Sequence, residues 1–145
     1  PAGLELQSFT STIVPNSADQ ITWHIGDLGF DMVLMGRVPS MITKSLPSNL
    51  NTILDGHRPE DIEHWAIHPG GRTILDAVEK SIGLPGDSLR QSRDVLRRFG
   101  NMSSATVMFV LNEMLQANTI AGRGCAMAFG PGVTVESMLF QTTGS

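Results

Sequence analysis

Residues 63–71 read Glu-His-Trp-Ala-Ile-His-Pro-Gly-Gly, and this stretch decides the fold. The short apolar run 65–67 predicts a buried strand that ends at His68. Proline fixes φ and glycine accepts conformations that other residues avoid, so residues 69–71 predict a sharp turn. A helix follows, because apolar residues recur at helical spacing at Ile74, Leu75, Val78 and Ile82. A histidine is then expected beside the free N–H groups of a helix start, an arrangement that suits stabilising negative charge.

A second junction of the same kind lies one helix further along the chain. The stretch Gly100-Asn101-Met102-Ser103-Ser104 ends one predicted helix and opens the next. Gly100 is the natural residue to follow a helix C-terminus, because glycine adopts the left-handed conformation without strain. The sequence therefore predicts a second polar side chain, that of Asn101, at a place where the backbone turns.

Three strands are expected before these junctions. Residues 4–14 predict a strand that Pro15-Asn16-Ser17 closes, and residues 21–25 predict a second, half-buried strand with its apolar side chains on one side. The turn 27–29 leads into a returning strand over residues 30–35. A short helix then begins near Pro39, and Pro47 is expected to break or kink it. Residues 55–59 predict a surface loop.

The remainder of the chain predicts helices and then two strands. A turn at residues 84–87 precedes the helix that ends at Gly100, with Asp87 or Ser88 as its N-cap. Residues 105–117 form the most apolar helix and are expected to be buried on most sides. Strands over residues 125–128 and 133–140 flank a tight loop at 129–132. The order β-β-β-α-β-α-α-β-β predicts a single α/β domain over residues 1–145 with a mixed sheet.

Composition narrows the classes of function. The 145 residues suffice for one domain with a sizeable core, and the formal net charge of −4 argues against a nucleic-acid partner. The sequence contains no apolar run of membrane-spanning length and no signal peptide, so no membrane partner is expected. The single Cys125 excludes an internal disulfide framework and suits a reducing cytoplasm, which is the expected location.

Three stretches, 65–71, 100–107 and 128–136, resemble the chalcone-synthase-like type III polyketide synthases. Their order and spacing fit that family, and the resemblance runs from about Leu4 to Phe140. It covers only the C-terminal half of such an enzyme. The resemblance implies the C-terminal half of a thiolase-like fold, in which two similar halves pack sheets and helices into five layers.

His68 and Asn101 are the candidate catalytic residues. An imidazole and a carboxamide can each donate a hydrogen bond to a developing oxyanion. The resemblance implies that these two positions bind a thioester carbonyl, stabilise the enolate left when malonyl-CoA loses carbon dioxide, and that the histidine also supports a cysteine thiolate. The residues alone leave structural readings open, in which His68 bonds to the backbone and Asn101 caps its own helix.

The resemblance also implies a set of substrate-binding residues. Gly70 and Gly71 lie where a pantetheine arm passes, and Thr73 stands at a position often held by alanine. Ser103 matches a cavity-lining serine, and the loop at 129–132 shapes the cavity in which the growing chain cyclises. Trp23 and Met32 replace a glycine and a phenylalanine of the plant enzymes, so the plant substrate does not carry over. The expected contacts are Gly70, Gly71, Thr73, Ser103, Trp23, Met32, Phe129, Gly130 and Pro131.

Other chemistry-bearing residues favour structural roles. Cys125 lies within an apolar strand, where cysteine behaves as a small hydrophobe, and no motif of the family's nucleophile surrounds it. A zinc site from His64, His68 and Cys125 lacks a fourth ligand, so no metal is expected. Four arginines on the helix before Gly100 are expected to form a solvated face: Arg90, Arg93, Arg97 and Arg98.

The resemblance implies a homodimeric acyltransferase that extends a starter acyl-CoA with malonyl-CoA by decarboxylative Claisen condensation and cyclisation. Acyl-CoA and malonyl-CoA are expected as substrates, without a cofactor. The N-terminal half carries the nucleophilic cysteine, so this chain alone is expected to be inactive. Two alternatives stay open: a ketoacyl synthase III-like condensing enzyme, which uses a similar catalytic set, and a non-catalytic half-domain that binds or dimerises with a partner. The sequence does not reveal the starter or the ring-closure chemistry.

Overall fold

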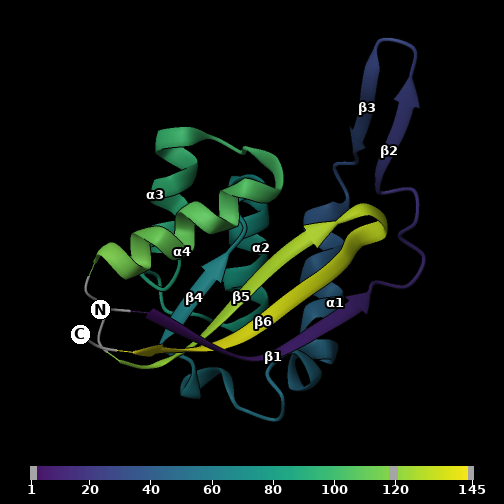
Figure 1. The fold of residues 1–145 in the computed structure, drawn as a ribbon. Coiled ribbons are helices and arrows are strands. Elements are labelled where there is room, and N and C mark those ends of the chain that lie inside the picture. Colours follow the sequence, from purple (N-terminus) through teal and green to yellow (C-terminus); the bar gives the residue numbers. More distant parts are fainter. Residues whose placement is uncertain (1–2, 118–120, 144–145) are drawn as a thin grey trace.

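A four-stranded mixed sheet forms the centre of the domain. The structure, a computed structural model, describes residues 3–117 and 121–143 (Figure 1). The sheet order is β1-β6-β5-β4, from strands β1 (Gly3–Ile13), β6 (Thr134–Thr143), β5 (Arg123–Gly130) and β4 (His64–Ile67). β4 runs parallel to β5, whereas β5–β6 and β6–β1 are antiparallel. The predicted α/β class and mixed sheet are therefore confirmed.

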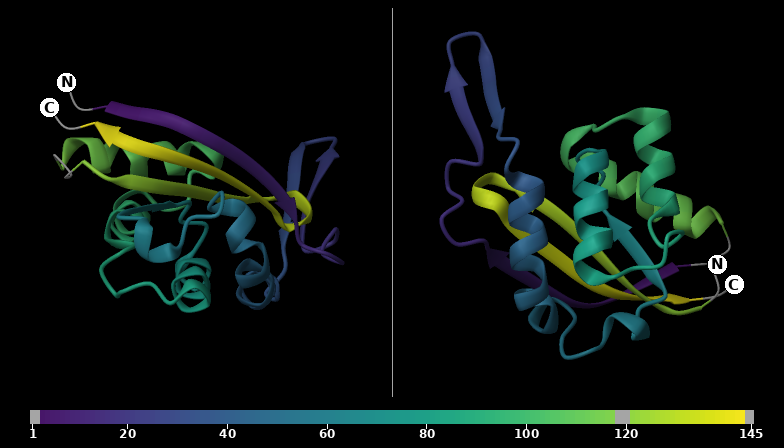
Figure 2. Two further views of the ribbon diagram at one scale, coloured as in Figure 1. Left: turned by 90° about the horizontal axis from the view of Figure 1, so that it is seen from below. Right: turned by 180° about the vertical axis from the view of Figure 1, so that it is seen from behind.

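Strands β2 (Ile21–Gly26) and β3 (Gly29–Leu34) form a separate antiparallel hairpin. Figures 1 and 2 show it projecting away from the remainder of the domain. The hairpin and its turn confirm the sequence prediction, but the half-buried reading of β2 is wrong. Ile21 is buried, whereas Trp23 is 46% and Ile25 86% exposed. The alternation predicts which side chains share a face, and no element among the described residues covers the outer part of that face.

One face of the sheet carries the larger apolar core. Helices α1 (Val38–Ile53) and α2 (Arg72–Ile82) lie side by side there, as Figure 2 shows. The buried side chains of this face include three cross-strand neighbours, Trp65 of β4, Cys125 of β5 and Leu139 of β6. The strand over residues 65–67 and the helix beginning after Gly71 are thus confirmed.

The opposite face is covered over β4 and β5 by helix α4 (Thr106–Gln116). Ala66 and Ala126, neighbours on this face, are small enough for Val110 and Met114 of α4 to pack closely against them. Helix α3 (Arg90–Phe99) closes the outer edge of β4, where the Ile67 N–H donates a hydrogen bond to Ser92 Oγ at 3.2 Å. An edge protected in this way cannot pair with another strand.

Predictions about helices α3 and α4 are wrong in two respects. α4 is buried along one stripe only, and Met108 and Phe109 are 62% and 40% exposed, because a helix on a single sheet buries one face. α3 begins at Arg90 with Leu89 as N-cap and no side-chain cap bond among the described residues, rather than at Asp87 or Ser88, since the fully buried Leu89 holds the preceding turn in the core. Three helices lie between β4 and β5, as the individual helical stretches predict, and only the summary order, which counts two, is wrong.

Pro47 does not break α1, which is continuous from Val38 to Ile53. Proline removes one backbone hydrogen bond, but its ring lies on the exposed side, where water can solvate the freed carbonyl. On the other side Ile42, Leu46 and Ile53 are each 1% exposed, so their burial holds both halves of the helix on the same core. Pro39 occupies the first turn, as predicted.

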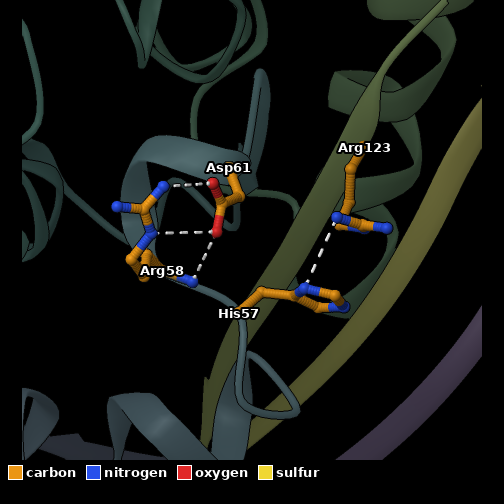
Figure 3. A network of polar contacts seen from close by, with 4 residues as sticks. All are labelled: His57, Arg58, Asp61 and Arg123. Atoms are coloured by element: carbon orange, nitrogen blue, oxygen red, sulfur yellow. Dashed lines mark hydrogen bonds and ion pairs between the residues drawn. The ribbon is translucent and has the colours of Figure 1, made fainter.

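The surface loop after α1 is tied down by the polar contacts in Figure 3. The Arg58 guanidinium donates to both carboxylate oxygens of Asp61, at 3.3 and 3.0 Å, and the Arg58 backbone N–H donates to one of them at 3.0 Å. His57 Nδ1 lies 3.5 Å from the guanidinium of Arg123 on β5. The predicted loop is therefore confirmed, and the contact between His57 and Arg123 connects it to the central sheet. Across the described part of the chain, the helices are too short or too polar to span a bilayer.

Gly124 tests how tightly β5 is held. A Cβ at this residue would lie 2.1 Å from Cζ of Phe140, its cross-strand partner, and Phe140 is fully buried. Gly124→Ala should therefore lower the free energy of unfolding by about 1–3 kcal/mol, as overpacked cores do. Gly86→Ala is the control, because its Cβ meets nothing within 4 Å. Chemical denaturation measures both, and equal stabilities of the two variants would contradict this packing.

Candidate functional site

A cavity of about 420 Å³ lies where the two predicted junctions meet the hairpin and the β5–β6 turn. Its lining comes from β2, β3, the start of α1, the end of β4, the start of α2, the loop after α3 and the β5–β6 turn. The residues are Ile21, Trp23, Met32, Leu34, Val38, His68, Gly70, Ile74, Asn101, Ser103, Ser104, Ala128, Phe129, Gly130, Pro131 and Glu136. The wall is mainly apolar, and polar groups gather at the junction end.

His68 lies directly after the last residue of β4 and continues the register of that strand. Its N–H donates to Met127 O of β5 at 2.8 Å, which fixes the direction of the side chain. The residue is 8% exposed, and its Nδ1 atom is buried without a hydrogen-bond partner among the described residues. The ring edge with Cδ2 and Nε2 faces Gly70. Because Nδ1 has no acceptor, the neutral tautomer with its proton on Nε2 is favoured, which places a donor on the cavity side.

Burial lowers the pKa of His68 from its usual 6.5, because the charged imidazolium loses its hydration. The imidazole is thus held neutral at neutral pH. A neutral imidazole donates a hydrogen bond without bringing a positive charge into an apolar cavity.

The carboxamide of Asn101 is held in one orientation by groups of opposite kind. Its Oδ1 accepts the Ser103 backbone N–H at 2.9 Å, and a backbone N–H can only donate. Its Nδ2 donates to Gly70 O at 3.2 Å, and a carbonyl can only accept. The amide cannot flip without losing both bonds. Nδ2 carries two hydrogens, so one remains available for a ligand in the cavity.

Gly70 is the point at which the two junctions meet. Its N–H donates to His68 O at 2.9 Å, and its carbonyl accepts from Asn101, which lies 31 residues away in the sequence. A Cβ built on Gly70 would lie 3.9 Å from His68 Nε2. His68 and Asn101 therefore line one cavity from either side of the same glycine. Asn101 also binds Ser103 within its own turn, but it does not cap a helix, because the N-caps of the two helical segments that follow are Met102 and Ala105.

Ser103 has a left-handed backbone conformation, with φ of 62°, which is uncommon outside glycine. It is supported by the bond to Asn101 and by buried Thr106, whose Oγ1 donates to Ser103 O and accepts from Met102 N–H, both at 2.8 Å. Such a conformation costs of order 1–3 kcal/mol and persists only where the surroundings fix it. Here the surroundings hold the turn that aims the Asn101 amide.

The cavity contains most of the predicted contact residues. Trp23 and Met32 are cross-strand partners on the hairpin, and Phe129, Gly130 and Pro131 form the opposite wall. Gly70 and Ser103 lie at the polar end. Gly71 and Thr73 do not line this cavity: Gly71 is the N-cap of α2, and Thr73 is exposed in its first turn.

Several lining residues were missed by the sequence reasoning. Ile21 and Leu34 share the hairpin face with Trp23, so strand alternation could have identified them. Glu136 ends the third family stretch; it pairs with Ala128 and accepts a hydrogen bond from Ser11 Oγ at 2.7 Å. Ser104 and Ala128 lie within the second and third family stretches but were not singled out, and Val38 and Ile74 gave no signal of their own, because only the tertiary fold brings them to the cavity.

Cys125 is fully buried on the sheet face that α1 and α2 cover, and burial raises the pKa of its thiol to about 12. It is therefore not a thiolate at neutral pH, in agreement with its predicted structural role. The described residues contain no group of three or more side chains able to hold a metal ion.

Three of the four arginines of α3 bind neighbouring carboxylates. Arg93 pairs with Asp76, at 2.8 Å, and with Glu79 of α2; Arg98 pairs with Glu113 of α4 at 2.8 Å. Arg97 pairs with Asp94 on its own helix at 3.2 Å. The pairs of Arg93 and Arg98 join α3 to α2 and α4, and all of these arginines are partly exposed, which agrees with the solvated-face prediction.

The fold and the cavity define a mixed α/β domain that presents two neutral hydrogen-bond donors at the end of an apolar pocket. The family model described as "Chalcone and stilbene synthases, C-terminal domain" matches residues 5–143. The chain belongs to this family of type III polyketide synthases, and it corresponds to their C-terminal domain. The family consists generally of acyltransferase-type enzymes.

The lowered pKa of His68 predicts a pH dependence of stability. Between the folded-state pKa and 6.5 the unfolded chain binds a proton that the folded chain does not. The free energy of unfolding should therefore rise with pH through this window. Below the folded-state pKa, the fold should have lost all of the stability that the neutral His68 contributes. His68→Gln should flatten the slope in this window, as measured by denaturation at closely spaced pH values. An unchanged slope, or an NMR titration of His68 above 6.5, would contradict the assignment.

Proposed function

We propose that this domain supplies the oxyanion-binding half of a type III polyketide synthase active site, which condenses a starter acyl-CoA with malonyl-CoA and cyclises the product. The observation that carries the proposal is the meeting of His68 and Asn101 at Gly70 in one mainly apolar cavity. Two such donors suit a thioester oxygen better than a metal or phosphate, because neither carries a formal charge.

The chemistry needs an electron pair to be stabilised at one oxygen. When malonyl-CoA loses carbon dioxide, the bond between the carboxyl carbon and the α-carbon breaks, and its electrons remain as the enolate of the acetyl thioester. The His68 Nε2–H and the free Asn101 Nδ2–H would donate to that enolate oxygen. Each such donor contributes about 2.7–4 kcal/mol in well-studied enzymes. The thioester and the departing carbon dioxide supply the driving force, so the proposal includes no metal or prosthetic group.

The nucleophile belongs to another part of the complete enzyme. Cys125 is unsuitable, since it lies on the opposite face of the sheet with a strongly raised pKa. We therefore propose an N-terminal half that brings a cysteine to the mouth of the cavity, and a thiolase-like fold for the two halves together.

Exposed apolar surface supports this partner. Phe9 and Ile13 of β1 are 69% and 71% exposed on the same sheet face as Ala66 and α4, and Met108 of α4 is 62% exposed. Large apolar side chains left exposed on one face of a sheet are typical of an interface. The N-terminal half would cover it, and the complete enzyme is proposed to be a homodimer.

The 145-residue chain alone should form no condensation product. It lacks a usable thiolate, because the thiol of Cys125 has a pKa of about 12. Incubation with malonyl-CoA and several starter acyl-CoAs, followed by mass spectrometry for pyrones, tests this expectation. A product that disappears in Cys125→Ala would show that the chain carries its own nucleophile and would overturn the division of roles.

In the complete enzyme, Asn101→Ala should slow malonyl-CoA decarboxylation by about 10²–10³-fold, the effect of removing one oxyanion donor. Starter loading should fall less, because an enolate oxygen carries more negative charge than a ground-state carbonyl. Asn112→Ala is the matched control, since Asn112 is an exposed asparagine on α4 and outside the cavity. Release of carbon dioxide and acyl-enzyme formation are measured separately. Equal losses in both steps would refute an enolate-specific role.

A further inference from the structure

The segment between β1 and β2 passes beside the β5–β6 turn, as Figures 1 and 2 show. It covers residues 14–20, and we call it the connecting segment. The Val14 N–H donates to Val133 O at 3.3 Å, and a Cβ built on Gly132 would lie 3.8 Å from Cα of Ala18. The connecting segment and the turn are therefore in direct contact.

Ser17 is the residue that ties the connecting segment to the turn. It is 1% exposed, so water has little access to it. Its Oγ donates to Gly132 O at 2.6 Å and is also within bonding distance of Val14 O. Carbonyl oxygens can only accept, so the two share the single hydroxyl hydrogen in a three-centre bond. One hydroxyl thus joins the residue that follows β1 to the turn between β5 and β6.

The same serine also fixes the start of the hairpin. Ser17 O accepts the Gln20 N–H at 3.0 Å, and Gln20 O accepts the N–H of Met35, which follows β3, at 2.9 Å. Ile21, the residue after Gln20, lines the cavity, and residues 129–131 of the turn line its opposite wall. Ser17 itself does not line the cavity, yet it links the two walls.

The turn needs such support because its backbone conformation is unfavourable. Gly132 and Val133 both have positive φ, of 66° and 45°. Glycine tolerates this region, whereas a β-branched residue is strained there. Val133 is nevertheless fully buried, and its carbonyl accepts the bond from Val14. Contacts with the connecting segment therefore hold the turn in a conformation that Val133 disfavours.

We propose that Ser17 is a positioning residue for cyclisation, because its hydroxyl sets the spacing between the hairpin and the β5–β6 turn. This inference rests on the proposed function. Ser17 takes no part in the chemistry at His68 and Asn101, since contacts with β5, Gly70 and Ser103 orient those two side chains. Loss of the hydroxyl should alter which products form and leave decarboxylation unchanged.

The test uses Ser17→Ala in the complete enzyme, with hexanoyl-CoA as starter and malonyl-CoA as extender. Mass spectrometry gives the ratio of the parent enzyme's main product to all other triketide and tetraketide products. Because the hydroxyl stabilises one wall spacing over relaxed ones by a single neutral hydrogen bond, its loss should lower that ratio by about threefold to tenfold. The kcat and KM for malonyl-CoA decarboxylation should stay within about twofold, which reports that the variant is folded.

Ser81→Ala is the matched control. It removes a serine hydroxyl that also donates to a backbone carbonyl, that of Val78 at 2.9 Å, but on α2 and outside the cavity. It should change neither the product ratio nor decarboxylation.

An unchanged product ratio in Ser17→Ala would overturn the proposal. A parallel loss of decarboxylation would also overturn it, since Ser17 would then only support the fold. In both cases condensation of hexanoyl-CoA by the parent enzyme would leave the proposed function intact. No condensation with any starter of a panel from acetyl-CoA to dodecanoyl-CoA would refute that function itself.

Discussion

The bond from Asn101 to the Gly70 carbonyl is the contact on which the site depends. It joins the turn after β4 to the turn after α3, two segments that lie 31 residues apart in the sequence. Because the other end of the same amide binds Ser103 N–H, the bond also sets which atom of Asn101 faces the cavity. The remaining elements provide support: β5 fixes His68 through Met127, and Thr106 holds the turn that carries Asn101.

Much of this arrangement could be predicted from sequence because local chemistry determines it. A proline and two glycines after an apolar run determine where β4 ends, and Gly100 determines where α3 ends. The two polar junctions, the hairpin and the mixed sheet follow from such signals. That His68 and Asn101 meet at Gly70 does not follow from them, since it depends on how α2, α3 and β4 pack. The family resemblance supplied that expectation, and the described contacts give its geometry.

The wrong predictions concern what covers each surface. Alternation correctly groups Trp23 with Ile25, yet their exposure depends on whether another element lies above the hairpin. In the same way the apolar sequence of α4 predicts a helix but not that Met108 and Phe109 face outward. The predicted break at Pro47 and the predicted N-cap of α3 are wrong for a related reason. Burial of Leu46, and of Leu89, outweighs a local backbone preference. The open surface of β1 and α4 is the one that a second half is proposed to cover.

The most direct test of the central claim is a crystal structure of the complete enzyme with a non-hydrolysable malonyl- or acetyl-CoA analogue. The account predicts that one thioester oxygen lies about 3 Å from both His68 Nε2 and Asn101 Nδ2. Asn101 should retain its bonds to Gly70 O and Ser103 N–H while it donates its second hydrogen to the ligand. An analogue whose carbonyl oxygen contacts neither side chain, or reaches Asn101 only after the bond to Gly70 is broken, would contradict the account.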